Sequence, residues 1–332
     1  MRALVSKAAG SFDTLVFETL ADPAPRAGEV LVAVKACGVN YPDLLVIEDK
    51  YQARPKRPFA PGSEIAGIVE DVGEGVIGLK RGDRVIGQLA WGGMAEKAAV
   101  AEARCFRMPD GMSYEDGAAF IIAFGTTYHA LKQRGNLQKG DTLLVLGAAG
   151  GVGLAAVELG RVMGARVIAA CSTQEKLDLC LARGADGGVI YPRGPFDKDG
   201  KKALSNLLKL ACGPSGPNVI YDAVGGEYAE ASLRAIAWEG RFLVVGFPSG
   251  IPSIPLNLAL LKGCQIVGVF WGAWTERDPK SSRENSAELL QLYSDGKIKP
   301  HISAVYPLAE GSKALAALAE RRAQGKVVIR CS

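Results

Sequence analysis

The sequence has few of the residues that build metal sites and disulfide frameworks. It contains two histidines, and its seven cysteines are scattered and include no C-x-x-C pair. An odd number of scattered cysteines gives no support to a disulfide framework or to a structural zinc ribbon. A histidine-based site is not expected either, because His129 lies in an expected helix and His301 follows a proline.

Long apolar runs are also missing. The longest uncharged stretches, at about residues 143–157 and 263–274, are rich in glycine and shorter than the ~20 apolar residues of a transmembrane helix. Residues 1–7 contain no signal-peptide core, so we expect a cytoplasmic protein. Lysine and arginine number 39 against 35 acidic residues, and this net charge of +4 is too small to indicate a nucleic acid or a membrane as partner.

The 332 residues suggest two domains, and the sequence pattern changes along the chain. As far as residue 124, short apolar runs such as 30–36 and 65–72 alternate with glycine, proline and aspartate, which predicts a mostly antiparallel β domain. Residues 125–266 alternate strands (142–146, 166–170, 188–190, 219–221, 241–245) with helices (151–163, 175–183, 203–210, 228–237). This alternation predicts a parallel sheet covered on both faces. Residues 267–332 have a mixed pattern, with helices at 284–293 and 312–322 and a strand at 326–330, and are expected to return to the first domain.

The most informative motif follows the strand expected at 142–146. Residues 147–153 read G-A-A-G-G-V-G, and a helical pattern begins at once. Glycines there allow a tight turn and a close approach to a pyrophosphate, and the helix N-terminus offers free N–H groups to the phosphates. Ala148 replaces the first glycine of G-x-G-x-x-G, but the strand and the helix are both present. The sequence therefore predicts a dinucleotide site built on Ala148, Gly150, Gly151, Val152 and Gly153.

The end of the next strand indicates which dinucleotide binds. NAD sites place an acidic residue there, whereas this chain continues Cys171-Ser172-Thr173 and then reaches Lys176. The hydroxyls of Ser172 and Thr173 and the ammonium group of Lys176 suit a 2′-phosphate, which favours NADPH. An alternative is that Lys176 is a solvated residue in the first turn of a helix. The negative charge of the neighbouring Glu175 also argues against a phosphate at this position.

Motifs over essentially the whole chain resemble the medium-chain dehydrogenase/reductase superfamily, specifically its zinc-free quinone oxidoreductase branch of zeta-crystallin-like proteins. The matching segments are 38–43, 61–67, 72–76 with 82–85, 148–153, 221–226 and 325–328. The resemblance implies a discontinuous GroES-like catalytic domain at residues 1–124 and 267–332 and a Rossmann NADPH-binding domain at residues 125–266. It also implies a homodimer.

Three positions bear on a catalytic metal. The zinc-dependent alcohol dehydrogenases of the superfamily use a Cys, a His and a Cys, and the matching positions here hold Asn40, Ser63 and, approximately, Ile122. None of these is a thiolate or imidazole ligand, and the four-cysteine structural loop is absent, so no metal is expected. A metal-free site suits a substrate that already accepts hydride well. The resemblance implies NADPH-dependent reduction of a quinone or of a carbon–carbon double bond conjugated to a carbonyl.

The resemblance also implies roles for individual residues. Asn40 and Tyr41 match positions beside the nicotinamide, and Tyr51 matches a tyrosine at the cleft mouth, so these three are the candidate catalytic residues. The two tyrosines are equally explained as packing at a domain edge, and a further cleft tyrosine of some relatives is replaced by Leu45. The remaining cofactor contacts that the resemblance implies are Thr126, Tyr191, Gly246, Phe247, Val269, Phe270 and Trp271. The run 269–271 equally suits an edge strand in a dimer interface.

Two alternatives stay open at this point. An enoyl-thioester reductase on the same scaffold needs basic residues for a coenzyme A phosphate, and Lys50, Arg54, Lys56 and Arg57 form a suitable cluster, although a solvated loop explains them equally well. The other alternative is a non-catalytic, crystallin-like protein that binds NADPH without turnover.

Overall fold

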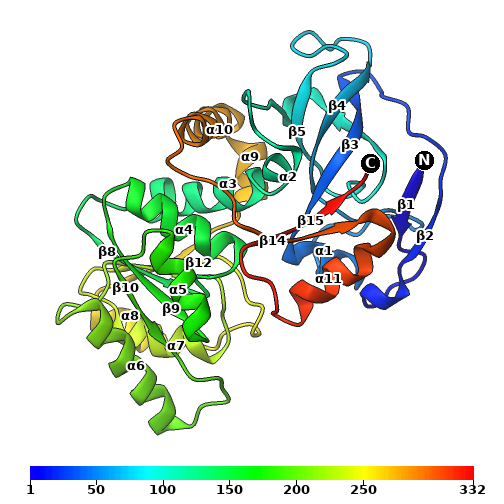
Figure 1. The fold of residues 1–332 in the computed structure, drawn as a ribbon. Helices are drawn as coiled ribbons and strands as arrows, with labels where there is room; N and C mark the ends of the chain where they lie inside the picture. Colours follow the sequence, from blue (N-terminus) through cyan, green and yellow to red (C-terminus); the bar gives the residue numbers. More distant parts are fainter. The chain divides into compact units, whose positions relative to one another are not determined.

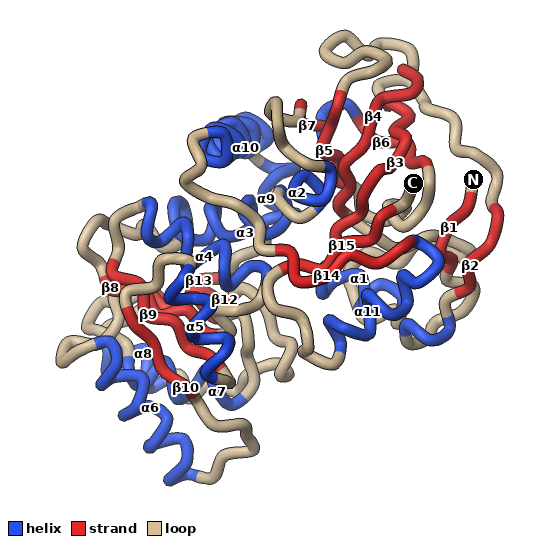
Figure 2. The backbone as a smooth tube through the Cα atoms, in the orientation of Figure 1, coloured by secondary structure: helices blue, strands red, loops and turns tan.

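The computed structural model describes all 332 residues, which form two units (Figure 1). The first unit contains Met1–Ile122 and Lys299–Ser332, and the second contains Ala123–Ile298. Each unit is organised around its own sheet, drawn in red in Figure 2.

A seven-stranded sheet forms the centre of the first unit. Its longest strand, β3, alternates half-buried and buried residues along most of its length, as expected where one face of a sheet covers a core. Neighbouring strands are antiparallel except for the parallel pair β14–β15, which confirms the predicted mostly antiparallel β class. The order is β14 (Ile302–Pro307), β15 (Lys326–Arg330), β3 (Glu29–Val39), β4 (Glu64–Val72), β5 (Arg84–Gln88) and β7 (Cys105–Arg107), and β6 (Lys97–Ala101) also pairs with β3.

Both ends of the chain contribute to the core of the first unit. The C-terminal strand β15 pairs with β3, and Leu4, Ile65 and Ile329 belong to one buried cluster. Helices α1 and α11 pack against each other beside this sheet. The remaining elements of the unit are the ribbon β1 (Arg2–Val5) with β2 (Val16–Thr19) and the helices α1 (Tyr41–Ile47), α2 (Tyr114–Ala118) and α11 (Gly311–Ala319).

The second unit contains a six-stranded sheet in which all pairs are parallel. The strand order is β10 (Gly187–Ile190), β9 (Arg166–Cys171), β8 (Thr142–Leu146), β11 (Val219–Asp222), β12 (Arg241–Val244) and β13 (Gln265–Gly268). The direction of winding reverses between β8 and β11, which is the doubly wound arrangement predicted from the sequence. In such sheets ligands bind beyond the carboxyl ends of the strands, at this switch point.

The helices that connect the strands of this sheet are α4 (Gly151–Val162), α5 (Gln174–Ala182), α6 (Lys198–Cys212), α7 (Glu227–Ala235) and α8 (Asn257–Lys262). Helix α3 (Ile121–His129) precedes β8, and α9 (Trp271–Arg277) and α10 (Pro279–Ser294) follow β13. Helix α6 begins at Lys198 and not at residue 203, because the Asp197 carboxylate accepts a hydrogen bond of 2.7 Å from the Gly200 N–H and caps the helix.

The second unit extends further along the chain than the boundary expected at residues 266 and 267. That boundary falls inside β13, which pairs with β12 in the parallel sheet. Helix α10 also belongs to this unit, because Tyr128 and Lys132 each donate a hydrogen bond of 2.6 Å to Glu288. Residues 267–298, expected in the first domain, thus lie in the second unit.

The helices also bear on membrane association. The longest, α6 and α10, have 15 and 16 residues, and no helix of the structure combines the length and the hydropathy of a membrane span.

Candidate functional site

The glycine-rich turn lies between β8 and α4, at the switch point of the parallel sheet. Gly147 follows the last residue of β8 with φ of +67°, a conformation that favours glycine. The Gly150 N–H donates to the Gly147 carbonyl at 3.0 Å, which closes the turn, and α4 starts at Gly151. Gly150 caps the helix without a side chain, so the first N–H groups of α4 have no side-chain acceptor there. This is the arrangement that binds a pyrophosphate.

Gly153 sets how closely α4 approaches the turn. A Cβ atom added at this position lies 2.2 Å from the Gly147 carbonyl oxygen and 2.8 Å from the Ala148 Cα atom. Both neighbours are backbone atoms, so a side chain at residue 153 requires a movement of the turn or of the helix. The glycine is therefore needed for the close packing of helix and strand that such a turn uses.

The loop after β9 lies next to the glycine-rich turn. The Ala148 N–H donates to the carbonyl of Ala170 in β9 at 3.3 Å, and Cys171 ends that strand. Ser172 is half-buried, and the Thr173 hydroxyl caps α5 by accepting a hydrogen bond of 3.3 Å from the Lys176 N–H. NAD sites place an acidic residue at the end of this strand, whereas this chain has Cys171 and Ser172 there.

The other predicted cofactor residues of this sheet follow the carboxyl ends of β10, β12 and β13. Gly246 lies shortly after β12, where an added Cβ atom would have no neighbour within 4 Å, and the exposed Phe247 comes next. Val269 is half-buried and Phe270 is exposed, directly after β13. The fold therefore places these residues along the same edge of the sheet as the glycine-rich turn.

Two of the predicted aromatic residues are packed inside the second unit. Tyr191 follows β10 and is buried beside Tyr228, with 5.1 Å between the ring centroids. Trp271, the first residue of α9, is buried against Gly125 of α3, where an added Cβ atom lies 2.6 Å from the indole ring. Both residues are buried within the second unit, and little of either ring is exposed.

Helix α3 contributes Thr126, which is half-buried, and a neighbour that the sequence analysis did not select. The buried Thr127 hydroxyl lies 3.2 Å from the Val152 carbonyl in the first turn of α4 and 2.9 Å from the Tyr221 hydroxyl in β11. These bonds join α3 to the glycine-rich turn. The only signal for Thr127 in the sequence was its position next to the predicted Thr126.

Asp222 ends β11 on the other side of the switch point. Its Oδ1 atom accepts hydrogen bonds of 2.9 Å from the N–H groups of Val224 and Gly225. Burial raises the pKa of Asp222 to about 6, although these two hydrogen bonds act to lower it. The Oδ1 atom of Asp222 thus holds the turn after β11.

In the first unit, Asn40 belongs to a buried polar network. Its Nδ2 atom donates to the Gly38 carbonyl at 3.3 Å and to Glu64 Oε2 at 3.2 Å, and its Oδ1 atom accepts from Lys326 Nζ at 2.6 Å. Lys326 Nζ also donates to Glu64 at 3.1 Å, and the Ile122 N–H donates to the other oxygen of Glu64 at 2.9 Å. Both N–H donors of the Asn40 amide are therefore used inside the protein.

Asp43 extends this network into the first turn of α1. Its carboxylate accepts from the Asn40 N–H at 2.8 Å and from the Ser63 hydroxyl at 3.2 Å. Burial raises the pKa of Asp43 to about 6, and the Asn40 N–H, the charge of Lys326 and the Ser63 hydroxyl act against that rise. Asn40 and Ser63, which match two zinc-ligand positions of the zinc-dependent alcohol dehydrogenases, are thus an amide and a hydroxyl that are bonded to protein groups. The structure has no group of three His, Cys, Asp or Glu side chains placed to hold a metal ion.

The two candidate tyrosines differ in their surroundings. Tyr41 is the first residue of α1 and is 37% exposed. Tyr51 is half-buried against the core of the first unit, and burial raises its pKa, with a further rise from the charge of Asp43. Tyrosines are ordinarily protonated at neutral pH, and the raised pKa favours the protonated form of Tyr51 further.

The basic cluster after α1 is partly used by the protein itself. Lys50 pairs with Glu48 at 2.9 Å, and Arg57 pairs with Asp49 at 2.9 Å. Only Arg54 and Lys56 of the four cluster residues are exposed without an ion pair in the structure. This arrangement weakens the argument for a coenzyme A site.

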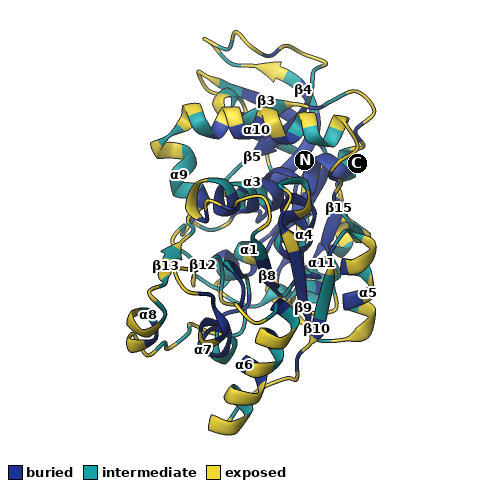
Figure 3. Cartoon of the chain, turned by 90° about the vertical axis from the view of Figure 1, so that its left-hand side faces the viewer, coloured by how far each residue is buried: buried dark blue, intermediate teal, exposed yellow.

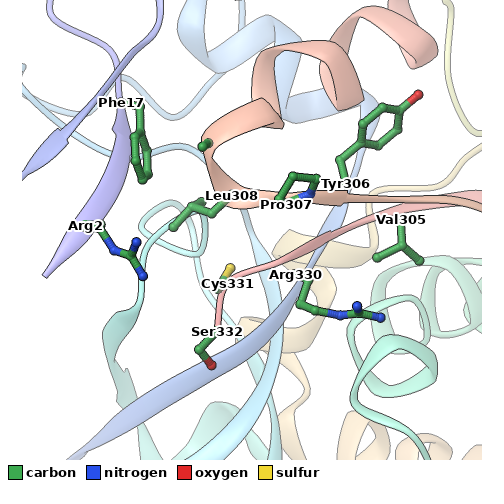
Figure 4. A pocket seen from close by; sticks show the side chains of 10 residues that line it. Arg2, Phe17, Val305, Tyr306, Pro307, Leu308, Arg330, Cys331 and Ser332 are labelled. Carbon is green, nitrogen blue, oxygen red and sulfur yellow. The ribbon is translucent and has the colours of Figure 1, made fainter.

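A hollow of about 390 Å³ lies elsewhere in the first unit, and Figure 4 shows its lining. Its two arginines are paired, Arg2 with Glu96 at 2.6 Å and Arg330 with Glu115 at 2.8 Å. None of the predicted site residues lines it. The hollow is therefore not part of the candidate site.

Comparisons with known proteins agree with this architecture. Two family profiles match the chain, an alcohol dehydrogenase GroES-like domain at residues 26–110 and a zinc-binding dehydrogenase at residues 151–292. The zinc-binding dehydrogenase profile does not cover Asn40, Ser63 or Ile122, the three residues that match zinc-ligand positions. A quinone oxidoreductase-like protein 2 homolog from Nematostella vectensis is 42% identical over 305 residues, which cover 91% of this chain and 81% of that protein.

Solved structures of quinone oxidoreductases have the same fold. The enzyme of Thermus thermophilus, solved also as a complex with NADPH, is 34% identical with a TM-score of 0.84 over 99% of this chain and 100% of that one. The Escherichia coli enzyme in complex with NADPH is 27% identical with a TM-score of 0.91 over 99% and 100% of the two chains. The chain therefore belongs to the quinone oxidoreductase family of the medium-chain dehydrogenase/reductase superfamily.

Proposed function

We propose that this protein reduces quinones or α,β-unsaturated carbonyl compounds by hydride transfer from NADPH, without a catalytic metal. The observation that carries the proposal is the glycine-rich turn at the switch point of a parallel sheet, beside a strand end that has no acidic residue. The similarity to quinone oxidoreductases solved with NADPH supports it.

The residues of the second unit fit NADPH. The N–H groups of Gly151, Val152 and Gly153 at the start of α4 suit the pyrophosphate, and the absence of a side chain at Gly153 lets the helix pack closely against the turn. Ser172 and Lys176 suit the 2′-phosphate. When bound, NADPH supplies the hydride. The protein has to orient the nicotinamide, exclude water and donate hydrogen bonds to the substrate oxygen.

We assign the hydrogen-bond donors to the tyrosines of the first unit. The Tyr51 hydroxyl is protonated at neutral pH, as tyrosines ordinarily are, and burial raises its pKa further, so it is able to donate a hydrogen bond to an oxygen that becomes negative as hydride arrives. Tyr41 offers a second, more exposed hydroxyl. Asn40 has a positioning role, because its amide N–H groups are bonded to Gly38 and Glu64 and α1 begins directly after it.

Metal independence rests on the side chains at three positions. Asn40 and Ser63 are bonded to protein groups, and Ile122 has no ligand atom in its side chain. A free thiolate or imidazole is what Zn²⁺ prefers, and none stands at these positions.

We also propose a cytoplasmic location, because all seven cysteines are free, which is typical of a reducing compartment.

The acceptor is tested by initial rates of NADPH oxidation. With 1,4-naphthoquinone we expect a kcat/KM at least about tenfold higher than with crotonyl-CoA, a difference of ~1.4 kcal/mol in transition-state stabilisation. The opposite order would establish an enoyl-thioester reductase. NADPH binding without turnover of either compound would establish a non-catalytic binding protein.

The choice of cofactor is tested with Lys176→Ala. A hydrogen bond to a charged group contributes about 1.5–3 kcal/mol, so the Kd for NADPH is expected to rise roughly ten- to hundredfold. The Kd for NADH should stay within about twofold, since NADH has no 2′-phosphate. Calorimetric titrations measure both values. Lys209→Ala, which removes an exposed lysine from the last turn of α6, is the matched control. Equal losses for both nucleotides would show that the 2′-phosphate binds elsewhere.

The protein is also proposed to be a homodimer joined along β13. This strand is an edge of the parallel sheet, and the neighbouring α8 carries Leu260 and Leu261 at 78% and 63% exposure (Figure 3). Leu256 and Ile266 extend this apolar surface. An exposed edge strand beside a large apolar patch is suited to pairing with a second copy of the same strand.

The dimer is tested by Leu260→Lys. We expect the wild-type protein to sediment as a dimer at micromolar concentration and the variant to sediment as a monomer, because two lysines would be buried in a symmetric interface. Leu210→Lys is the control, since Leu210 is 82% exposed on α6, away from β13. A monomeric wild type, or a dimer that Leu260→Lys leaves intact, would contradict the proposed interface.

A further inference from the structure

A pair of thiols lies directly beneath the loop assigned to the 2′-phosphate. Cys171 ends β9 and Cys180 lies in α5, and their Sγ atoms are 3.6 Å apart. Their side chains are 2% and 0% exposed. Ser172 and Thr173 form the turn between the two elements, so the two sulfur atoms link the last residue of the strand to the helix that follows it.

Cys171 is also bonded to the glycine-rich turn. The Ala149 N–H donates to the Cys171 sulfur, and Lys176 brings a positive charge near it. The hydrogen bond with Cys180 lowers the pKa of the Cys171 thiol, whereas the same bond and burial raise the pKa of Cys180. Cys171 is thus the sulfur with more thiolate character, and Cys180 is placed to react with it after oxidation.

We propose that Cys171 and Cys180 are a peroxide-sensitive dithiol that forms a reversible disulfide and thereby weakens nucleotide binding. The Cys171 thiolate attacks one oxygen of hydrogen peroxide, the O–O bond breaks, and a sulfenic acid and hydroxide form. The Cys180 sulfur then attacks the Cys171 sulfur, the S–O bond breaks, and a second hydroxide leaves. The two thiols lose two electrons and two protons, and the peroxide becomes two molecules of water.

The disulfide has to change the geometry of the site. A disulfide bond is about 2.05 Å long, so the sulfur atoms must move together from 3.6 Å. Cys171 then has no thiolate to accept the Ala149 N–H, and α5 is drawn toward β9. Ala149 belongs to the pyrophosphate turn, and Ser172 and Lys176 to the assigned 2′-phosphate loop. Because both thiols are buried, peroxide reaches them when this turn opens.

Peptide mapping of the full-length protein tests the bond itself. Trypsin cleaves after Lys176, between the two cysteines, so a disulfide joins peptide 167–176 to peptide 177–183. After reduction and mild treatment with hydrogen peroxide, we expect this linked pair, and dithiothreitol should remove it. Cys264→Ser is the control, since Cys264 is a half-buried cysteine elsewhere in the unit and its loss should not alter the link. Oxidation of Cys264 or Cys105 without the linked pair would overturn the proposal.

Calorimetry with NADPH tests the coupling to the site, which rests on the proposed function. The oxidised wild type is expected to bind NADPH at least about fivefold more weakly than the reduced protein, and saturating NADPH should shift the thiol–disulfide equilibrium toward the two thiols by the same factor. In the double variant Cys171→Ser/Cys180→Ser, peroxide should not change the affinity. An unchanged affinity in the linked wild type would overturn the coupling. Failure of the reduced protein to bind NADPH would refute the proposed function, while peptide mapping would still decide the disulfide.

Discussion

Lys326→Met is expected to lower the free energy of unfolding by about 3–5 kcal/mol, the usual cost of removing one partner from a buried ion pair. Lys326 is 5% exposed, and its ammonium group lies 3.1 Å from the carboxylate of Glu64, which is fully buried. Without it, Glu64 keeps an uncompensated charge, and the Val39 carbonyl and Asn40 Oδ1 lose a donor. Urea denaturation measures the change.

Arg330→Met is the matched control for this variant. Arg330 lies on the same strand, β15, and forms an ion pair of 2.8 Å with Glu115, but its side chain is 60% exposed. Exposed pairs contribute about 0–1 kcal/mol, so this variant should lose no more than that. Adding Glu64→Gln to Lys326→Met should restore part of the lost stability, because the buried charge is removed. Equal small losses for Lys326→Met and Arg330→Met would show that the buried network is not important for stability.

Gly153→Ala is expected to disable the nucleotide site. The added Cβ atom meets backbone atoms of Gly147 and Ala148 at 2.2 and 2.8 Å, so the turn or the start of α4 has to move. Overpacking of this kind costs about 1–3 kcal/mol of stability. Displaced N–H groups at the helix N-terminus should raise the Kd for NADPH at least about tenfold, equivalent to ~1.4 kcal/mol. Calorimetric titration with NADPH measures the loss of affinity.

Gly187→Ala provides the control for the glycine replacement. Gly187 lies in β10 of the same sheet, and an added Cβ atom meets only Ile168 Cδ1 at 3.7 Å, an ordinary contact. This variant should bind NADPH as the wild type does. An unchanged NADPH affinity in Gly153→Ala would show that the cofactor does not depend on the glycine-rich turn.

The cofactor half of the protein was largely predictable because its signals are local. A strand that ends in glycines and passes directly into a helix identifies the turn, and the predicted strand 142–146 is β8. The position of β13 was not predictable in the same way. This strand has four residues, is mostly exposed, and joins the parallel sheet only through its pairing with β12. The expected domain boundary therefore fell inside it.

The polar network around Asn40 illustrates what a sequence pattern leaves out. Lys326 is 286 residues from Asn40 along the chain, and their contact depends on the pairing of β15 with β3. Trp271 gives a second example. An aromatic residue that covers a ligand and one that fills the core look alike in sequence, and the small Gly125 opposite the indole ring decides between them.

We propose above all that the protein reduces an organic acceptor with NADPH and needs no metal. Its most direct test is the rate of NADPH oxidation with 1,4-naphthoquinone before and after dialysis against a strong chelator, with the metal content measured in both samples. We predict turnover within about twofold of the untreated rate, since Asn40, Ser63 and Ile122 supply no soft ligands. A loss of turnover on chelation that Zn²⁺ restores would show that the protein depends on a catalytic metal.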